Sequence, residues 1–162
     1  MIDVILNDLA KLCLQQQLQV TTAESCTGGL VAKLMTDLPG SSQWFERGFV
    51  TYSNLAKEQM LGVETSLLSE FGAVSEEVAL AMVKGALAHS QAQLALSITG
   101  IAGPGGGSDS KPVGLVCFGW AYSGDKAIIA TTEQQQFSGD RDAVRQQSAL
   151  YALQKLLEIA LP

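Results

Sequence analysis

Strand-like and helix-like segments alternate along this chain of 162 residues, and this alternation limits the fold more than any other feature. The expected strands are short and rich in β-branched or apolar residues: 19–23, 45–53, 94–101, 113–122 and 126–137. The expected helices are 3–17, 25–38, 54–62, 65–71, 76–90 and 141–161. We therefore expect a three-layer α/β/α fold with a mixed, mostly parallel sheet. Ser123-Gly124-Asp125 would join the last two strands into an antiparallel edge hairpin.

Local sequence signals set several of these boundaries. Pro39-Gly40 should end the second helix, and Ser75 and Asp140 are expected to cap the two helices that follow them. The first helix should bury one apolar face, formed by Val4, Leu6, Leu9, Leu12 and Cys13. No repeat or linker divides the chain, so residues 1–162 are expected to form one domain.

Composition excludes several classes of partner. The net charge is −6 and no run of Lys or Arg occurs, which argues against nucleic-acid binding. No apolar run reaches the roughly 18 residues that span a membrane, and the N-terminus does not resemble a signal peptide. Three widely spaced cysteines indicate a reducing cytoplasm rather than disulfides. We therefore expect a cytoplasmic protein that binds a small molecule.

Histidine is nearly absent, and this limits the available catalysts. The single histidine, His89, ends a small-residue helix, where it is better interpreted as a solvated cap than as a catalytic base. The chain also lacks clusters of His and Cys at metal-ligand spacing, so we expect no metal and no cofactor. A catalytic serine in this chain would need lysine as its base.

The stretch 23-AESCTGG-29 marks a change from strand to helix and contains two candidate nucleophiles, Ser25 and Cys26. Free amides at a helix start could form an oxyanion hole, here from Cys26, Thr27, Gly28 and Gly29. The alternative interpretation is that Ser25 only caps the helix.

The stretch 51-TYSNLAK-57 supplies a candidate base. Lys57 would lie in the first turn of a helix, where the dipole and partial burial lower the pKa of a lysine. Tyr52 could orient the amine or relay a proton. The alternative is an ordinary surface lysine beside a half-buried tyrosine.

A glycine-rich loop and an arginine pair form a third candidate region. The loop 102-AGPGGGSDSKP-112 follows a strand but fits neither a Walker A loop nor a GxGxxG fingerprint. Its amides could contact an anion, or it could be only a mobile connection. Arg141 and Arg145 share one face of the last helix, which suggests anion binding.

Five motifs in order, AESCTGGLVA, FVTYSNLAK, LSITGIAGPGGG, KPVGLV and GDRDAVR, resemble the CinA C-terminal domain family over about residues 5 to 160. Its characterised members are nicotinamide-nucleotide amidases, and others are fused to a second domain; we expect this chain to be the stand-alone form. The resemblance implies a stand-alone homodimeric amidase that converts nicotinamide mononucleotide to nicotinic acid mononucleotide for NAD synthesis. It also implies Ser25 as nucleophile, Lys57 as base and Tyr52 as assistant.

The resemblance further implies a nucleotide site. Its residues would be Thr99, Gly100, Ala102, Gly103, Arg141 and Arg145, with the phosphate on Arg145 and Arg141 in support. Two alternatives stay open at this point: a catalytically silent nucleotide-binding module, and a cysteine hydrolase that uses Cys26.

Overall fold

A single five-stranded sheet organises the computed structural model, which describes residues 1–125 and 127–162. Its strands are β1 (Val20–Glu24), β2 (Phe45–Val50), β3 (Leu94–Gly100), β4 (Leu115–Ser123) and β5 (Ile128–Gln136), in the spatial order β2-β1-β3-β4-β5. Strand β1 pairs in parallel with both β2 and β3, whereas β4 runs antiparallel to β3 and β5 antiparallel to β4. The sheet is therefore mixed, with a hairpin at one edge, as expected.

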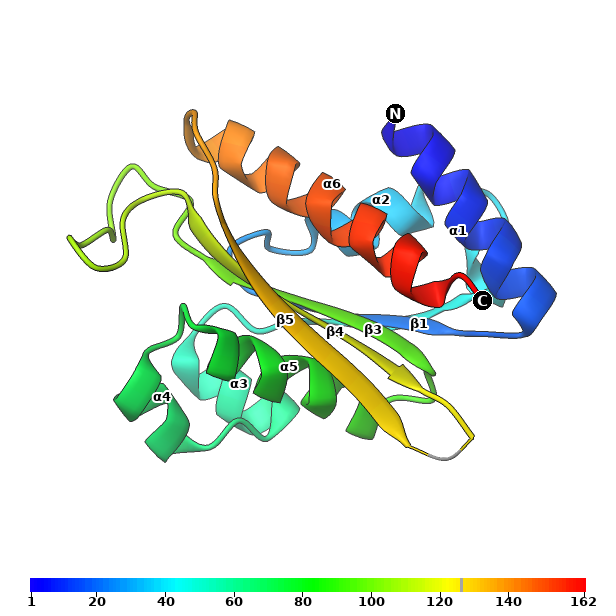
Figure 1. Ribbon diagram of the computed structural model, residues 1–162, viewed down its shortest axis with the longest axis horizontal. Helices are drawn as coiled ribbons and strands as arrows, with labels where there is room; N and C mark the ends of the chain where they lie inside the picture. The colour runs from blue at the N-terminus through cyan, green and yellow to red at the C-terminus, as the bar shows by residue number, and fades with distance from the viewer. Residues whose placement is uncertain (126) are drawn as a thin grey trace.

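Helices cover both faces of the sheet (Figure 1). One layer contains α1 (Ile2–Gln16), α2 (Leu30–Thr36) and α6 (Arg141–Ala160). The other contains α3 (Asn54–Leu61), α4 (Thr65–Phe71) and α5 (Glu76–Ala88), and a 3-10 turn, η1 (Ser41–Gln43), precedes β2. The predicted three-layer α/β/α class is confirmed.

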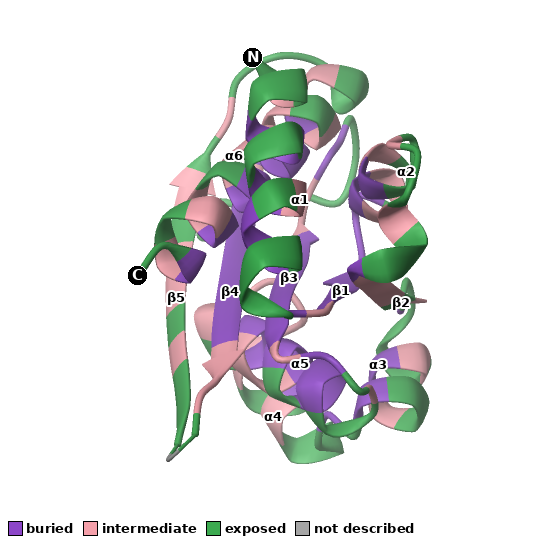
Figure 2. Cartoon of the chain, turned by 90° about the vertical axis from the view of Figure 1, so that its right-hand side faces the viewer, coloured by how far each residue is buried: buried purple, intermediate pink, exposed green. Residues whose placement is uncertain are grey.

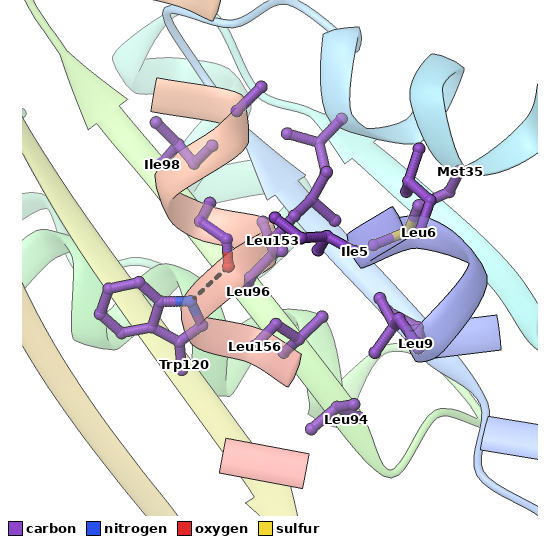
Figure 3. Packing of buried hydrophobic residues seen from close by; sticks show 14 of the residues in the cluster. Ile5, Leu6, Leu9, Met35, Leu94, Leu96, Ile98, Trp120, Leu153 and Leu156 are labelled. Atoms are coloured by element: carbon purple, nitrogen blue, oxygen red, sulfur yellow. Dashed lines mark hydrogen bonds between the residues drawn. The ribbon is translucent and has the colours of Figure 1, made fainter. Parts of the chain in front are cut away.

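The main hydrophobic core fills the space between the sheet and the α1–α6 layer. Leu9 of α1, Leu153 of α6 and Leu96 of β3 are fully buried in it (Figure 3). Trp120 of β4 is also buried, and its indole N–H donates to the Ala152 carbonyl at 3.0 Å. The central strands are buried along nearly their whole length, whereas β5 has exposed and half-buried residues (Figure 2). The ends of β1 and β3 extend from this buried centre.

Several predicted boundaries need correction. The buried face of α1 includes Ile5, whereas Val4 is 62% exposed, because the helix begins at Ile2 and its apolar stripe is rotated from the expected one. The hairpin strands begin two residues later than expected, at Leu115 and Ile128. Lys126, the expected first residue of the last strand, lies outside the described residues.

The largest correction concerns the second helix, which begins at Leu30 rather than at Ser25. The predicted caps at Ser75 and Asp140 are confirmed, since their side chains accept from the amides of Val78 and Ala143. Over the described part of the chain, no helix combines the length and apolar character that a bilayer crossing requires.

Candidate active site

A cavity of about 250 Å³ lies at the carboxyl ends of the parallel strands, where open α/β sheets usually bind ligands. Strand β1 leads into it through Ser25, β2 through Tyr52 and β3 through Thr99. The lining residues are Ser25, Cys26, Tyr52, Asn54, Lys57, Ala73, Val74, Thr99, Gly100, Ile101, Ala102, Gly103, Gly105, Gly106 and Arg141.

Ser25 and Lys57 meet in this cavity. The Lys57 Nζ atom lies 2.9 Å from Ser25 Oγ, 2.9 Å from the Thr51 carbonyl oxygen and 3.3 Å from the Tyr52 carbonyl oxygen. The Lys57 nitrogen thus has three oxygen atoms within hydrogen-bond distance, as many as an ammonium has N–H groups. The sequence-predicted pair is thus within hydrogen-bond distance, although 32 positions separate its members.

Burial controls the protonation of Lys57. Its side chain is only 1% exposed, and this removal from water lowers the pKa of the ammonium below its ordinary value of 10.5. Ser53 caps α3 by accepting from the Ala56 amide, so Lys57 belongs to the first turns of that helix, as predicted. The positive end of the helix dipole disfavours the ammonium in the same direction.

The five residues from Ser25 to Gly29 form a turn, not the start of a helix. Gly28 and Gly29 have φ values of 59° and 103°, which a side-chain-bearing residue rarely adopts. Gly28 donates its amide to the Ser25 carbonyl, so its expected role in an oxyanion hole is corrected. The hydrogen bonds of the described residues leave the amides of Cys26, Thr27 and Gly29 without an acceptor, and of these three residues only Cys26 lines the cavity.

The Cys26 thiol is poorly suited to nucleophilic chemistry. Cys26 is 6% exposed, and burial raises the pKa of its thiol from 9.0 to about 11. A reactive cysteine requires a lowered pKa, because the thiolate is the nucleophile. The geometry therefore favours Ser25 over its neighbour.

Tyr52 takes part through two different groups. Its carbonyl oxygen contacts the Lys57 amine, as described above. Its phenol is exposed and accepts from the Arg141 guanidinium at 3.0 Å, so the expected approach of the hydroxyl to Lys57 is not observed. Arg141 also donates to the Gly103 carbonyl at 2.8 Å. The arginine thus links the β2–α3 connection to the glycine-rich loop at the mouth of the cavity.

Arg145 occupies a different place from the one predicted. It donates to the carbonyls of Cys26 and Thr27 at 3.2 and 3.1 Å and does not line the cavity, although a second hollow next to α6 contacts it. The two arginines therefore exchange the positions expected for them relative to the cavity. Arg141 lies at the cavity, and Arg145 supports the turn that carries Ser25.

The predicted loop residues Thr99, Gly100, Ala102 and Gly103 all line the cavity. The Thr99 hydroxyl donates to the Ala73 carbonyl at 2.8 Å and so joins β3 to the connection before α5. Contacts of Ala73 and Val74 with the cavity were not predicted, since only the tertiary fold brings this connection to β3.

Asn54 lies at the cavity and His89 lies outside it. Asn54 also lines the cavity and was missed as a site residue, although it belongs to the TYSNLAK motif. His89 lies at the C-terminal end of α5, where its Nδ1 atom is 2.8 Å from the Gly85 carbonyl oxygen. It does not line the cavity, which agrees with its interpretation as a helix cap.

Known proteins resemble this chain in both sequence and fold. The nicotinamide-nucleotide amidohydrolase PncC of Escherichia coli strain K12 is 60% identical over 137 residues, which are 85% of this chain and 81% of that protein. The protein of the same name from Pseudomonas putida is 53% identical over 141 residues, 87% of this chain and 86% of that protein.

A solved structure of the competence/damage inducible protein CihA from Agrobacterium tumefaciens has a TM-score of 0.92 at 42% identity, over 99% of this chain and 96% of that one. The CinA C-terminal domain profile matches residues 3–160. The chain belongs to the CinA C-terminal domain family.

Proposed function

We propose that this chain hydrolyses the carboxamide of nicotinamide mononucleotide to nicotinic acid mononucleotide and ammonia. The observation that carries the proposal is the buried Lys57 amine, 2.9 Å from Ser25 Oγ, beside a cavity that Arg141 also lines. The amidohydrolase names of relatives at 53–60% identity support the choice of substrate. Serine with lysine as its base is an attested form of nucleophilic catalysis.

Acylation begins with neutral Lys57. Its two N–H groups donate to the carbonyls of Thr51 and Tyr52, which leaves the nitrogen lone pair for the Ser25 hydroxyl proton. As Nζ takes that proton, Oγ attacks the carboxamide carbon and forms a tetrahedral intermediate. The Lys57 ammonium then gives its proton to the leaving nitrogen. Ammonia departs, and an ester joins the substrate to Ser25.

Backbone amides stabilise the oxyanion of that intermediate. The free amide of Cys26 is the first candidate, because Cys26 lines the cavity and directly follows the nucleophile. One such donor commonly contributes roughly 3 kcal/mol to the transition state. Deacylation repeats the sequence with water in place of serine: Lys57 takes a water proton, hydroxide attacks the ester, and Ser25 leaves with a proton from Lys57.

Arg141 is the proposed anchor for the phosphate of the substrate. It is the only arginine that lines the cavity within the described residues, and a guanidinium can hold two phosphate oxygens at once. The amides of Gly105 and Gly106, which also line the cavity, could complete an anion site. This assignment replaces the earlier one, which placed the phosphate on Arg145.

The cellular setting belongs to the same proposal. The product would enter pyridine-nucleotide salvage towards NAD. Cytoplasmic location, a homodimer, and one amidohydrolase domain over residues 1–162 stay predictions; the single sheet that runs through the chain supports the last of them.

An ammonia-release assay tests the proposed function directly. The purified chain is compared on nicotinamide mononucleotide, nicotinamide riboside and free nicotinamide. We expect the mononucleotide to give the highest kcat/KM. Tight binding of the mononucleotide without ammonia release would instead identify a silent binding module.

Arg141→Ala should lower kcat/KM for the mononucleotide by about 10- to 100-fold, mainly through KM. Hydrogen bonds to charged groups contribute about 1.5–3 kcal/mol, and 1.4 kcal/mol corresponds to a factor of ten. The riboside, which lacks the phosphate, should be affected less than tenfold. Arg47→Ala is the matched control, since Arg47 pairs with Glu46 on β2 outside the cavity. Equal losses for both substrates would contradict the phosphate assignment and indicate a role in loop placement.

Cys26→Ala should retain kcat within about threefold. Burial raises the pKa of the Cys26 thiol to about 11, so the thiol stays protonated at neutral pH, and the backbone amide survives the substitution. Steady-state kinetics check this result, and iodoacetamide should leave the wild-type protein active. Inactivation by the reagent, absent in Cys26→Ala, would reopen the cysteine mechanism.

A further inference from the structure

Glu24, the residue before the proposed nucleophile, is a buried carboxylate at the end of β1. Only 1% of its surface is exposed. One carboxylate oxygen accepts from the Val31 amide at 2.9 Å and the other from the Ala32 amide at 3.1 Å. Both amides belong to the first turn of α2, where the helix dipole favours a negative charge. The side chain therefore connects the end of β1 directly to the start of α2.

This connection joins the residues on either side of the turn that carries Ser25. The turn contains Gly28 and Gly29 at positive φ, and glycine loses more conformational freedom on ordering than any other residue. A precise position for Ser25 Oγ therefore needs restraints from outside the turn. Arg145 supplies one through the carbonyls of Cys26 and Thr27. The Glu24 carboxylate supplies a second one on α2.

Glu24 and Ser25 direct their side chains to opposite sides of the sheet. Glu24 bonds to α2, which lies in the α1–α6 layer, whereas Ser25 contacts Lys57 of α3, in the other layer (Figure 1). Successive residues of an extended strand alternate in this way. Glu24 thus lies behind the turn and away from the cavity, which it does not line. Its influence on the reaction must pass through the position of Ser25.

We propose that Glu24 is a positioning residue: its carboxylate fixes the Ser25–Gly29 turn to α2 and so holds Ser25 Oγ within reach of the Lys57 amine. The inference rests on the proposed function, in which Ser25 is the nucleophile. A displacement of about 1 Å at a reacting atom can cost about 100-fold in rate. Glu24 therefore governs kcat without contacting substrate.

Glu24→Gln is the first test. The variant keeps the shape but presents an NH₂ group to one of the two amides, so one of the paired hydrogen bonds is lost. We expect kcat for ammonia release to fall about 10- to 100-fold, with KM changed by less than threefold because the cavity walls remain. The pH profile of kcat/KM should keep its shape, since Lys57 is untouched. Glu64→Gln, at an exposed position before α4, is the matched control.

Ala32→Pro tests the same contact by removing a hydrogen-bond donor instead of the acceptor. It provides a second test if Glu24→Gln does not fold. Proline removes the Ala32 amide that donates to Glu24; Ala32 is the third residue of α2, within the first turn, where an amide has no acceptor inside the helix. We expect a similar fall in kcat. The double variant should lose less than the product of the two single losses, because both substitutions break one interaction. Unchanged kcat in both single variants, a shifted pH profile, or independent losses would each overturn the positioning role.

Amide hydrogen exchange separates this inference from the proposed function. Without substrate, the Val31 and Ala32 amides should exchange at least tenfold faster in Glu24→Gln than in the wild type, while core amides of β3 stay protected. If the wild-type protein releases no ammonia but this protection depends on Glu24, the proposed function fails and the structural link stands. If ammonia is released and the protection is unchanged in the variant, the Glu24 inference fails alone.

Discussion

Ser25→Ala should reduce ammonia release from nicotinamide mononucleotide by about 10⁴-fold or more while nucleotide binding persists. Without Oγ no ester can form, and removal of a nucleophilic serine leaves only the contribution of binding and the oxyanion hole. Binding should change by less than threefold, because Arg141 and the glycine-rich loop are untouched. The measurements are steady-state ammonia release and titration calorimetry with the mononucleotide.

The control for this variant is Ser69→Ala, which removes an exposed hydroxyl from α4 and should keep wild-type kinetics. A Ser25→Ala protein that retains more than a tenth of wild-type kcat would show that another group attacks the carboxamide. A large loss of binding would instead place the Ser25 hydroxyl in substrate recognition.

Lys57→Met and Lys57→Arg should each lower kcat/KM by about 10³-fold or more. Methionine removes the base, and arginine keeps the charge but cannot lose its proton at accessible pH. The wild-type kcat/KM should rise with pH through the pKa of Lys57, which burial places below 10.5, and then level off. This rise must vanish in both variants. Lys84→Met, at an exposed position on α5, is the control and should keep the wild-type profile.

The same buried amine makes stability depend on pH. In the unfolded chain Lys57 has its ordinary pKa of 10.5, whereas burial lowers the pKa in the folded protein. Between the two pKa values the unfolded state binds more protons, so the Lys57 contribution to the free energy of unfolding increases with pH and becomes constant above 10.5. Below the folded-state pKa its cost is fully present. Urea titrations measure the free energy of unfolding across this pH range. The increase due to Lys57 should be absent in Lys57→Met. The same pH dependence in both proteins would contradict the burial effect.

Sequence patterns predicted the layers of this fold well, because the relevant signals are local. Alternating strand and helix periodicity is set by neighbouring residues, as are the Ser75 and Asp140 caps. The pairing of Ser25 with Lys57 was also predictable, from the scarcity of histidine and from two short motifs. The start of α2 was not. The Val31 and Ala32 amides in its first turn are satisfied by Glu24, a carboxylate seven and eight residues earlier in the chain, and no standard capping pattern describes that contact.

The arginines show a second limit. Arg141 and Arg145 are four residues apart on α6, so their positions on one helix face were predictable. Their partners were not, because Arg145 finds the carbonyls of Cys26 and Thr27 through the packing of α6 against the rest of the fold. Tertiary packing determines which acceptors a long side chain can reach. Tyr52 behaves similarly, since its phenol contacts Arg141 and only its carbonyl reaches the amine.

The two halves of the cavity come from separate stretches of chain. The proposed reacting pair is Ser25 and Lys57, whereas other lining residues come from 99–106 and from Arg141. Changes in residues 99–106 leave the Ser25–Lys57 contact itself intact, whereas a change of Arg141 also removes its hydrogen bond to Tyr52. Under selection, such a protein could acquire a new carboxamide substrate by changing its glycine-rich loop and the start of α6 alone. A library confined to those two segments is the natural starting point for directed evolution of new amidases.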